Sequence, residues 1–200
     1  MPSPVGHALA GVAVALAGRR RPAPLTLRRF VTDPLTLWSV ALATLPDADL
    51  LLPGFHRTVT HSVSTTLAVS ILAIVVTGKV TGKRLEARGW GGGRIAWGVV
   101  LTLAAAHASH MLLDWLGADL SQPAGIQALW PWSDRWFISG WDLFPWIERR
   151  RPFSAVSMII NLHAFVWEAL LMGSIVGVIW WLRQGQRRST QSTQRPQSSH

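Results

Sequence analysis

The sequence predicts an all-α protein: a polytopic membrane helical bundle of about four to five helices, with a Trp-rich loop before the last span. Two compositional observations point there. Hydrophobic residues make up 49% of the 200 residues, and the mean hydropathy is +0.26. This length allows one compact domain or a small bundle of membrane helices, and the positive hydropathy favours the bundle. The third observation is a series of long apolar runs.

Five apolar runs cover residues 5–18, 35–52, 62–78, 95–117 and about 162–182, separated by stretches rich in Arg, Gly and Pro. A spanning helix needs about 20 mostly apolar residues, and the last three runs are long enough. The first covers only ~21 Å at a helical rise of ~1.5 Å per residue. It could be a signal peptide, but its arginine cluster follows the apolar run and no small-residue cleavage pattern follows. We therefore expect it to be retained as a helix.

The formal charge of +9 fits this arrangement. If five helices alternate with the N-terminus outside, 14 of the 19 basic residues fall on the inner side, as the positive-inside rule expects. Contact with anionic lipid then explains the charge better than contact with nucleic acid, so membrane lipids are expected partners and nucleic acid is not. We expect one membrane-embedded domain over residues 1–183 and a basic, disordered tail over residues 184–200.

Ionisable residues lie at one end of these runs. An Asp at a helix centre costs on the order of 2.5–3.5 kcal/mol, so such groups persist only beside water, each other or a metal. In the alternating topology, all of the following fall on the outer side: His7, Asp47, Asp49, His61 and Asp114.

One helical face concentrates these groups further. His110 and Asp114 are spaced i, i+4, and His107 extends the stripe by one turn. Taken alone, this pattern is equally typical of a capping Asp beside a buried, hydrogen-bonded His. The neighbouring His56 and the deep carboxylate of Glu168 add two further candidate ligands.

The absence of cysteine removes thiolate zinc sites and cysteine nucleophiles, so chemistry must come from imidazoles and carboxylates. Such a ligand set suits a divalent ion, most readily Zn²⁺, with Mn²⁺ or Fe²⁺ as alternatives. A metal-activated water makes hydrolysis the natural reaction. Asp47 or Asp49 could then act as general base or bridging ligand, and Arg57 could steady a substrate anion or simply face lipid headgroups. The tryptophans of residues 118–152 form either an interfacial belt or a lid for a lipid-like substrate.

The chain resembles the YdjM-type inner-membrane proteins, a family described as metal-dependent hydrolases. The resemblance covers roughly residues 5–135 and rests on five blocks in order: Gly6-His7, Leu45-Pro46-Asp47-x-Asp49, His56-Arg57-x-x-Thr60-His61-Ser62, Ser109-His110-x-x-Leu113-Asp114, and the Pro- and Trp-rich stretch 123–133. It implies metal-site roles for His7, Asp47, Asp49, His56, His61, His110 and Asp114. The chain departs from the family pattern in having Leu50 after the second Asp and in having His107. The His/Asp scheme is also similar, more distantly, to zinc-dependent phospholipase C and related nucleases.

These observations predict a metal-dependent hydrolase of a phosphoester or phospholipid-like substrate. We expect it in a bacterial inner membrane, with its site facing the non-cytoplasmic side. The alternative is a non-catalytic protein that binds a metal or transports an ion or proton. A His-box di-iron oxygenase is disfavoured because it needs about eight imidazoles, and the chain has six outside its tail.

Overall fold

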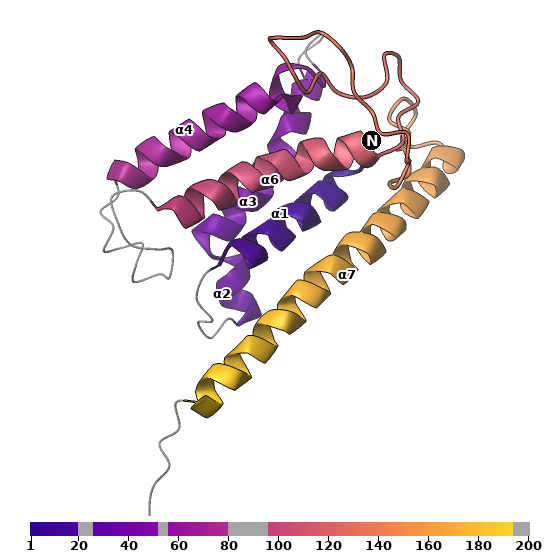
Figure 1. The fold of residues 1–200 in the computed structure, drawn as a ribbon. Helices are drawn as coiled ribbons and strands as arrows, with labels where there is room; N and C mark the ends of the chain where they lie inside the picture. Colours follow the sequence, from indigo (N-terminus) through magenta and orange to yellow (C-terminus); the bar gives the residue numbers. More distant parts are fainter. Residues whose placement is uncertain (20–25, 52–55, 80–95, 194–200) are drawn as a thin grey trace, which may run out of the picture.

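The structure is a computed structural model that describes residues 1–19, 26–51, 56–79 and 96–193. Within these ranges every regular element is a helix, and the only β pairing consists of two isolated bridges in a loop. The predicted all-α class is therefore confirmed. Figure 1 shows the longer helices running roughly alongside one another, with the short elements at their ends.

Helix α1 (Pro4–Gly18) lies at the centre of the bundle. It packs against α3 (Pro34–Thr44), α6 (Trp97–Leu116) and α7 (Ala155–Thr193). Ser3 caps its N-terminus by accepting hydrogen bonds from the amides of Val5 and Gly6. Gly11 lets α3 approach closely, because a Cβ there would lie 2.7 Å from the Ser39 carbonyl oxygen. The first apolar run therefore forms the innermost helix.

Within the described part of the chain, two helices are long and apolar enough to cross a membrane: α6, and the segment Ala155–Gln184 of α7. Two others are apolar but shorter, α1 and α4 (Val63–Lys79). Helix α4 packs on α6, whereas α7 packs mainly on α1 and has most of its span exposed. Its outward side chains are large and apolar, including Ile159, Leu170 and Trp181. Lipid contact would satisfy such a surface without any further protein.

The second apolar run does not form one spanning helix, which corrects the expectation for residues 35–52. Helix α3 ends at Thr44, and the chain continues as the 3-10 helix η1 (Leu45–Leu51). Pro46 has no backbone N–H, so an α-helix through this position would lack a hydrogen bond. Asp47 and Asp49 therefore lie in this 3-10 helix and not on α3.

The last helix is longer at both ends than the run that predicted it. It starts at Ala155 and continues to Thr193, and residues 194–200 lie outside the described part of the chain. Its last ten residues overlap the segment expected to be a disordered tail. The division of the chain into a membrane domain and a tail stays a prediction.

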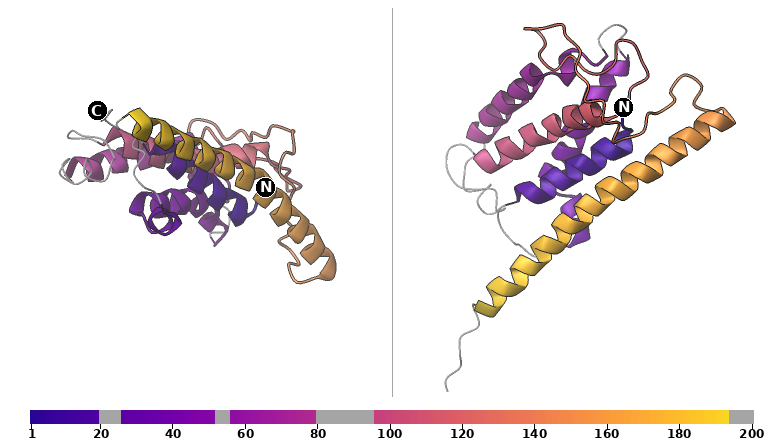
Figure 2. Two further views of the ribbon diagram at one scale, coloured as in Figure 1. Left: turned by 90° about the horizontal axis from the view of Figure 1, so that it is seen from below. Right: turned by 45° about the vertical axis from the view of Figure 1, so that its right-hand side comes forward.

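The Trp-rich loop between α6 and α7 covers one end of the bundle (Figure 2). Phe144 is its buried anchor, and the bridge between Gly117 and Phe144 fastens the loop to the end of α6. The amide of Val63 donates to the Ala128 carbonyl at 2.9 Å, which ties the loop to the start of α4. The loop therefore closes the end of the bundle where the ionisable side chains meet.

Candidate metal centre

Four helix ends bring the candidate ligands together. His7 lies in the first turn of α1, and Asp47 lies in η1 directly after α3. His61 ends the 3-10 helix η2 (Val59–His61), two residues before α4 begins. His110 and Asp114 occupy the last two turns of α6. The structure therefore brings all of these residues to one end of the bundle.

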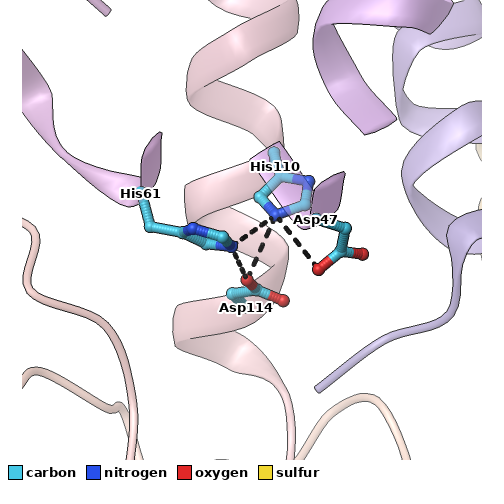
Figure 3. A group of neighbouring side chains, drawn as sticks. All are labelled: Asp47, His61, His110 and Asp114. Carbon is cyan, nitrogen blue, oxygen red and sulfur yellow. Dashed lines mark hydrogen bonds and ion pairs between the residues drawn. The ribbon is translucent and has the colours of Figure 1, made fainter. Parts of the chain in front are cut away.

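Four of them converge closely (Figure 3). One ligand atom each from Asp47, His61, His110 and Asp114 lies within 4.8 Å of all the others. The Asp114 Oδ2 atom is 3.2 Å from His61 Nε2 and 3.3 Å from His110 Nε2. His110 Nε2 is also 3.9 Å from Asp47 Oδ1. Three of these side chains are inaccessible to solvent, and only Asp47 is partly exposed, at 11%.

The outer nitrogens of both imidazoles are engaged by acceptors. His110 Nδ1 lies 2.8 Å from the Ala43 carbonyl oxygen, and His61 Nδ1 lies 3.2 Å from Asp49 Oδ2. A carbonyl and a carboxylate can only accept, so each Nδ1 carries the proton and, in a neutral ring, each Nε2 presents a lone pair. This outer support is what holds metal-ligating histidines in place. Both lone pairs therefore point at the centre of the group.

Asp49 is the organiser of the turn that carries His61. Its carboxylate accepts from His56 Nδ1 at 2.7 Å, from the Arg57 amide at 3.0 Å and from the Thr60 hydroxyl. Burial alone would raise the pKa of Asp49, but hydrogen bonds from His56, His61 and Thr60 hold it well below its usual range. Asp49 and His56 thus bind each other and orient His61, and neither lies among the four converging residues.

The centre holds more negative charge than its own protons offset. Burial would lower the pKa of His61, but the carboxylates of Asp114 and Asp49 raise it to about 9. When His61 is protonated, its Nε2 can donate to Asp114 Oδ2 at 3.2 Å, which still leaves both oxygens of Asp47 and the Oδ1 atom of Asp114 buried without a hydrogen-bond partner. Buried carboxylates in this state are costly, and a divalent cation at the convergence point would satisfy them. The donor set, two imidazole nitrogens and two carboxylate oxygens, therefore fits a divalent metal ion.

His7 lies on the far side of Asp114 from His61. Its Nε2 atom is 3.4 Å from Asp114 Oδ1, and its ring stacks on the His110 ring with centroids 3.8 Å apart. It is fully buried, and neither ring nitrogen has a hydrogen-bond partner. His7 therefore adjoins the four-residue group without belonging to it.

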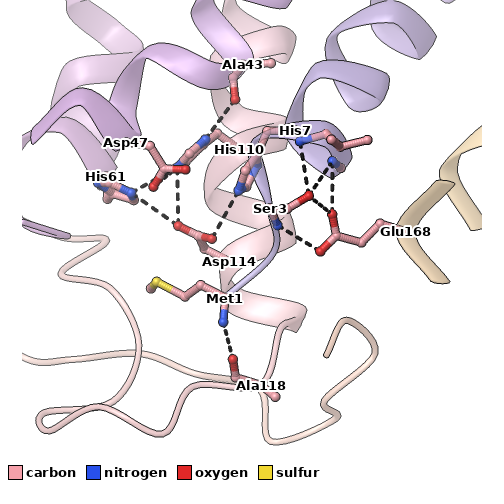
Figure 4. Close-up of polar contacts among 12 residues, drawn as sticks. Met1, Ser3, His7, Ala43, Asp47, His61, His110, Asp114, Ala118 and Glu168 are labelled. Carbon is pink, nitrogen blue, oxygen red and sulfur yellow. Dashed lines mark hydrogen bonds and ion pairs between the residues drawn. The ribbon is translucent and has the colours of Figure 1, made fainter. Parts of the chain in front are cut away.

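Two sequence candidates are placed elsewhere by the packing. His107 is one turn deeper on α6, and its Nδ1 lies 2.8 Å from the Thr66 hydroxyl on α4. Glu168 on α7 is fully buried against the start of α1, where it accepts hydrogen bonds from the Ser3 amide, the Ser3 hydroxyl and the Gly6 amide (Figure 4). Three donors from the start of α1 hold Glu168, so it acts as an anchor between helices.

Arg57 is held by the loop that covers the centre. Its guanidinium donates to the Asp119 carboxylate and, at 3.2 Å, to the Gly125 carbonyl oxygen. It also lies 5.1 Å from the centre of the Trp136 ring. Burial would raise the pKa of Asp119, but hydrogen bonds from Ser121 and Gly125, together with the Arg57 charge, lower it. Arg57 thus fastens the loop through this Nη1 atom, and its expected role in binding an anion stays a prediction.

Sequence reasoning missed the residues that support the ligands. Thr60 and Asp119 are polar loop residues, and the Ala43 carbonyl belongs to an apolar helix. The spacing of Asp119 and Ser121 could have indicated a local turn, because the Asp119 side chain accepts from the Ser121 amide at 3.0 Å. No sequence pattern could have paired Asp119 with Arg57, since these residues meet only through the fold of the loop.

Comparison with known proteins places this chain in a family. The chain is 28% identical over 199 residues to inner membrane protein YbcI of Escherichia coli (strain K12), an alignment that covers 92% of this chain and all of that protein. No solved structure matches the chain. The family described as YdjM inner membrane protein matches residues 1–186. The chain therefore belongs to the YdjM family of inner membrane proteins.

Proposed function

We propose that this protein is a membrane-embedded, metal-dependent hydrolase that cleaves a phosphoester. The observation that carries the proposal is the convergence of Asp47, His61, His110 and Asp114 at a buried end of the bundle. Two nitrogens and two carboxylate oxygens without a thiolate suit Zn²⁺, and Mn²⁺ or Fe²⁺ would also be accepted. A bound ion of this kind supplies an activated water and polarises a phosphoryl oxygen.

The residues around the ion would orient the ligands, admit the substrate and accept a proton. Asp49 and the Ala43 carbonyl keep His61 and His110 in the tautomer that presents Nε2 to the centre. Asp47 is the only one of the four converging residues with solvent exposure, so substrate would approach from its side. Both of its carboxylate oxygens lack a hydrogen-bond partner, so one can bind the ion while the other accepts a proton during hydrolysis.

A recess of about 390 Å³ is lined by His56 and Arg57, which both bind Asp49, and by none of the four converging residues. Trp146, Arg149 and Arg150 also line it, together with Asp119 and Glu148. Guanidinium groups bind phosphate oxygens well, and the indole adds an apolar surface. The link to the centre is Asp49, which binds both His56 and the ligand His61. This combination suits the phosphate of a lipid-like molecule, and membrane lipids are then the nearest source of substrate.

We further propose that α1 and α4 cross the membrane together with α6 and α7. At 15 and 17 residues, the two shorter helices span ~22 and ~25 Å. Arg19, Arg28 and Arg183 belong to the end of the bundle opposite the candidate centre: Arg19 follows α1, Arg28 lies in α2 (Leu27–Val31), and Arg183 donates to the Ala17 carbonyl at 2.7 Å. By the positive-inside rule, that end faces the cytoplasm and the centre faces the other side.

The test is metal quantification on full-length protein purified in detergent. We expect at least one equivalent of zinc or manganese per chain, lost in the double variant His110→Ala with Asp114→Ala. The matched control is His163→Ala, because His163 is an exposed histidine on α7 outside the centre. The loaded wild type is then assayed on phosphomonoesters, phosphodiesters and phospholipids, with hydrolysis expected from the wild type and the control alone.

Absence of bound metal from the wild type would refute the proposal. Metal binding without cleavage of any of these substrates would refute the hydrolase and favour the alternative predicted from the sequence, a metal-binding or ion-transporting membrane protein.

A further inference from the structure

His7 is a buried histidine whose ring nitrogens form no hydrogen bonds. No part of its side chain reaches solvent, and neither Nδ1 nor Nε2 has a hydrogen-bond partner. Native proteins rarely leave a buried polar group in this state unless an ion or water completes it. The nearest acceptor is Asp114 Oδ1, at 3.4 Å from His7 Nε2. Figure 4 shows the ring directed at this carboxylate.

One cation cannot satisfy all of these atoms. An ion among the four converging residues takes Asp114 Oδ2, because that oxygen is the one 3.2 Å from His61 Nε2 and 3.3 Å from His110 Nε2. His7 is not part of that group. The pair formed by His7 Nε2 and Asp114 Oδ1 therefore stays unsatisfied on the other side of the same carboxylate.

A carboxylate with one oxygen toward each of two positions is suited to bridging two cations, which lie about 3.5–4 Å apart in two-metal sites. Asp47 adds a second carboxylate with both oxygens buried and unpartnered. Together with the unpartnered nitrogens of His7, these oxygens leave ligand atoms for a second cation.

The position of His7 is fixed by the packing of α7 on α1. Glu168 accepts the amide hydrogens of Ser3 and Gly6, at 2.8 and 3.1 Å, in the turn that presents His7. Gly6 leaves room only for this carboxylate, because a Cβ there would lie 2.7 Å from Glu168 Oε2. The stacking of His7 on His110 fixes the ring as well. The nitrogen is therefore presented to Asp114 by a rigid frame.

We propose that the centre holds two divalent cations, with Asp114 bridging them and His7 as a ligand of the second. This inference rests on the metal centre of the proposed function and adds a second metal position to it. In a two-metal centre both ions can act on one phosphoester, so the inference favours phosphate esters as the substrate class.

The experiment counts metal ions in the full chain in three proteins: wild type, His7→Phe and His107→Phe. Phenylalanine keeps a ring that can stack on His110 but removes both nitrogens. His107 is the matched control, because it is another buried histidine, on α6, with its Nδ1 bound to Thr66. Each protein is stripped with chelator, reloaded with Mn²⁺, desalted and analysed for manganese. We expect two equivalents in the wild type and in His107→Phe, and one in His7→Phe.

A second measurement needs no variant. Two Mn²⁺ ions bridged by a carboxylate are magnetically coupled, so the reloaded wild type should show the electron paramagnetic resonance spectrum of a coupled pair. One equivalent in the wild type, with an uncoupled spectrum, would overturn the second site and leave the proposed function standing. Two equivalents retained in His7→Phe would overturn the role of His7. No manganese in any of the proteins would overturn both proposals.

Discussion

His61 and His110 approach each other through their Nε2 atoms, which lie 2.9 Å apart. The Nδ1 atom of each ring already faces an acceptor, Asp49 for His61 and Ala43 for His110. Two neutral rings in these tautomers would present lone pair to lone pair, so the short contact requires a proton or a metal ion between the two nitrogens. This relationship is the geometric basis of the candidate metal centre.

Asp114→Asn should remove the metal-dependent part of the stability. A ligand present at 100 times its Kd stabilises a folded protein by about 2.7 kcal/mol, and we expect the wild type to gain about this much from Zn²⁺. The variant keeps the shape of the side chain but loses its charge, so its gain should fall below about 1 kcal/mol. Thermal unfolding in detergent with and without Zn²⁺ measures the gain in stability of the wild type and of Asp114→Asn. Asp134→Asn, at an exposed loop position, is the control. An equal gain in both variants would contradict the assignment.

Asp49→Asn should weaken metal binding without removing a ligand. An amide can accept fewer of the hydrogen bonds that His56, Thr60 and His61 make to Asp49, so the His61 ring loses its orientation. Loss of such an outer partner typically costs 10- to 100-fold in metal affinity, and we expect a decrease of roughly that size. Metal titration measures it. If the number of ions bound at saturating metal also falls, then Asp49 is itself a ligand, contrary to the structure.

The Arg57–Asp119 ion pair should make the loop sensitive to acid. The folded protein lowers the pKa of Asp119 below the ordinary value of 3.8, through the hydrogen bonds of Ser121 and Gly125 and the charge of Arg57. The ionised carboxylate therefore stabilises the fold fully at pH values well above the ordinary pKa of aspartate. This contribution is lost as the pH falls through the lowered pKa of Asp119. Asp119→Asn should cost about 3 kcal/mol at pH 7, because it leaves Arg57 buried and unpaired.

The measurement is thermal unfolding of the wild type and Asp119→Asn between pH 7 and pH 2.5. The difference between them should be constant above about pH 5 and shrink below about pH 4. Asp142→Asn is the control, since Asp142 is exposed and asparagine tolerates its positive φ of 48°. A difference that does not change with pH would show that the Asp119 charge is not responsible.

Gly6→Ala should destabilise the packing of α7 on α1. The new Cβ would lie 2.7 Å from Glu168 Oε2, so the carboxylate would have to move and weaken its bond to the Gly6 amide. We expect a loss of about 1–3 kcal/mol. Gly173→Ala and Gly177→Ala on α7 are matched controls, because no atom lies within 4 Å of a Cβ at either position. Those changes should be neutral or slightly stabilising, and a similar loss in all three variants would contradict the anchoring role of Glu168.

Arg149→Gln combined with Arg150→Gln should weaken the binding of an anionic substrate. Both side chains line the recess beside His56 and Arg57, and neither touches the four converging residues. For the proposed reaction, we expect KM to rise about tenfold with kcat little changed. The reason is that the arginines would bind the substrate and the transition state equally well, so their loss weakens both to the same extent. Arg151→Gln is the control, as the next residue along and outside the recess lining. A fall in kcat with unchanged KM would place these arginines in the chemistry instead.

The local patterns of the chain predicted most of its helices and the composition of its site. Apolar runs located α1, α4, α6 and the span within α7, because lipid-exposed and buried helices need the same residue types. The i, i+4 spacing of His110 and Asp114 placed both on one helical face, as the structure shows. The end of α3 at Thr44 was not predicted, because hydropathy does not depend on backbone hydrogen bonding. Pro46, which lacks a backbone N–H, could have indicated it.

The sequence by itself determined that imidazoles and carboxylates gather at one end of an apolar helical bundle, because a membrane helix tolerates such groups only where they meet partners. Only the tertiary structure decided what each does. It set Asp47, His61, His110 and Asp114 within reach of one ion, turned Asp49 to hold His61, and bound Glu168 to the start of α1. The physical reason is that ligation and hydrogen bonding depend on distances of a few ångströms between different helices, and residue spacing along one helix does not specify them.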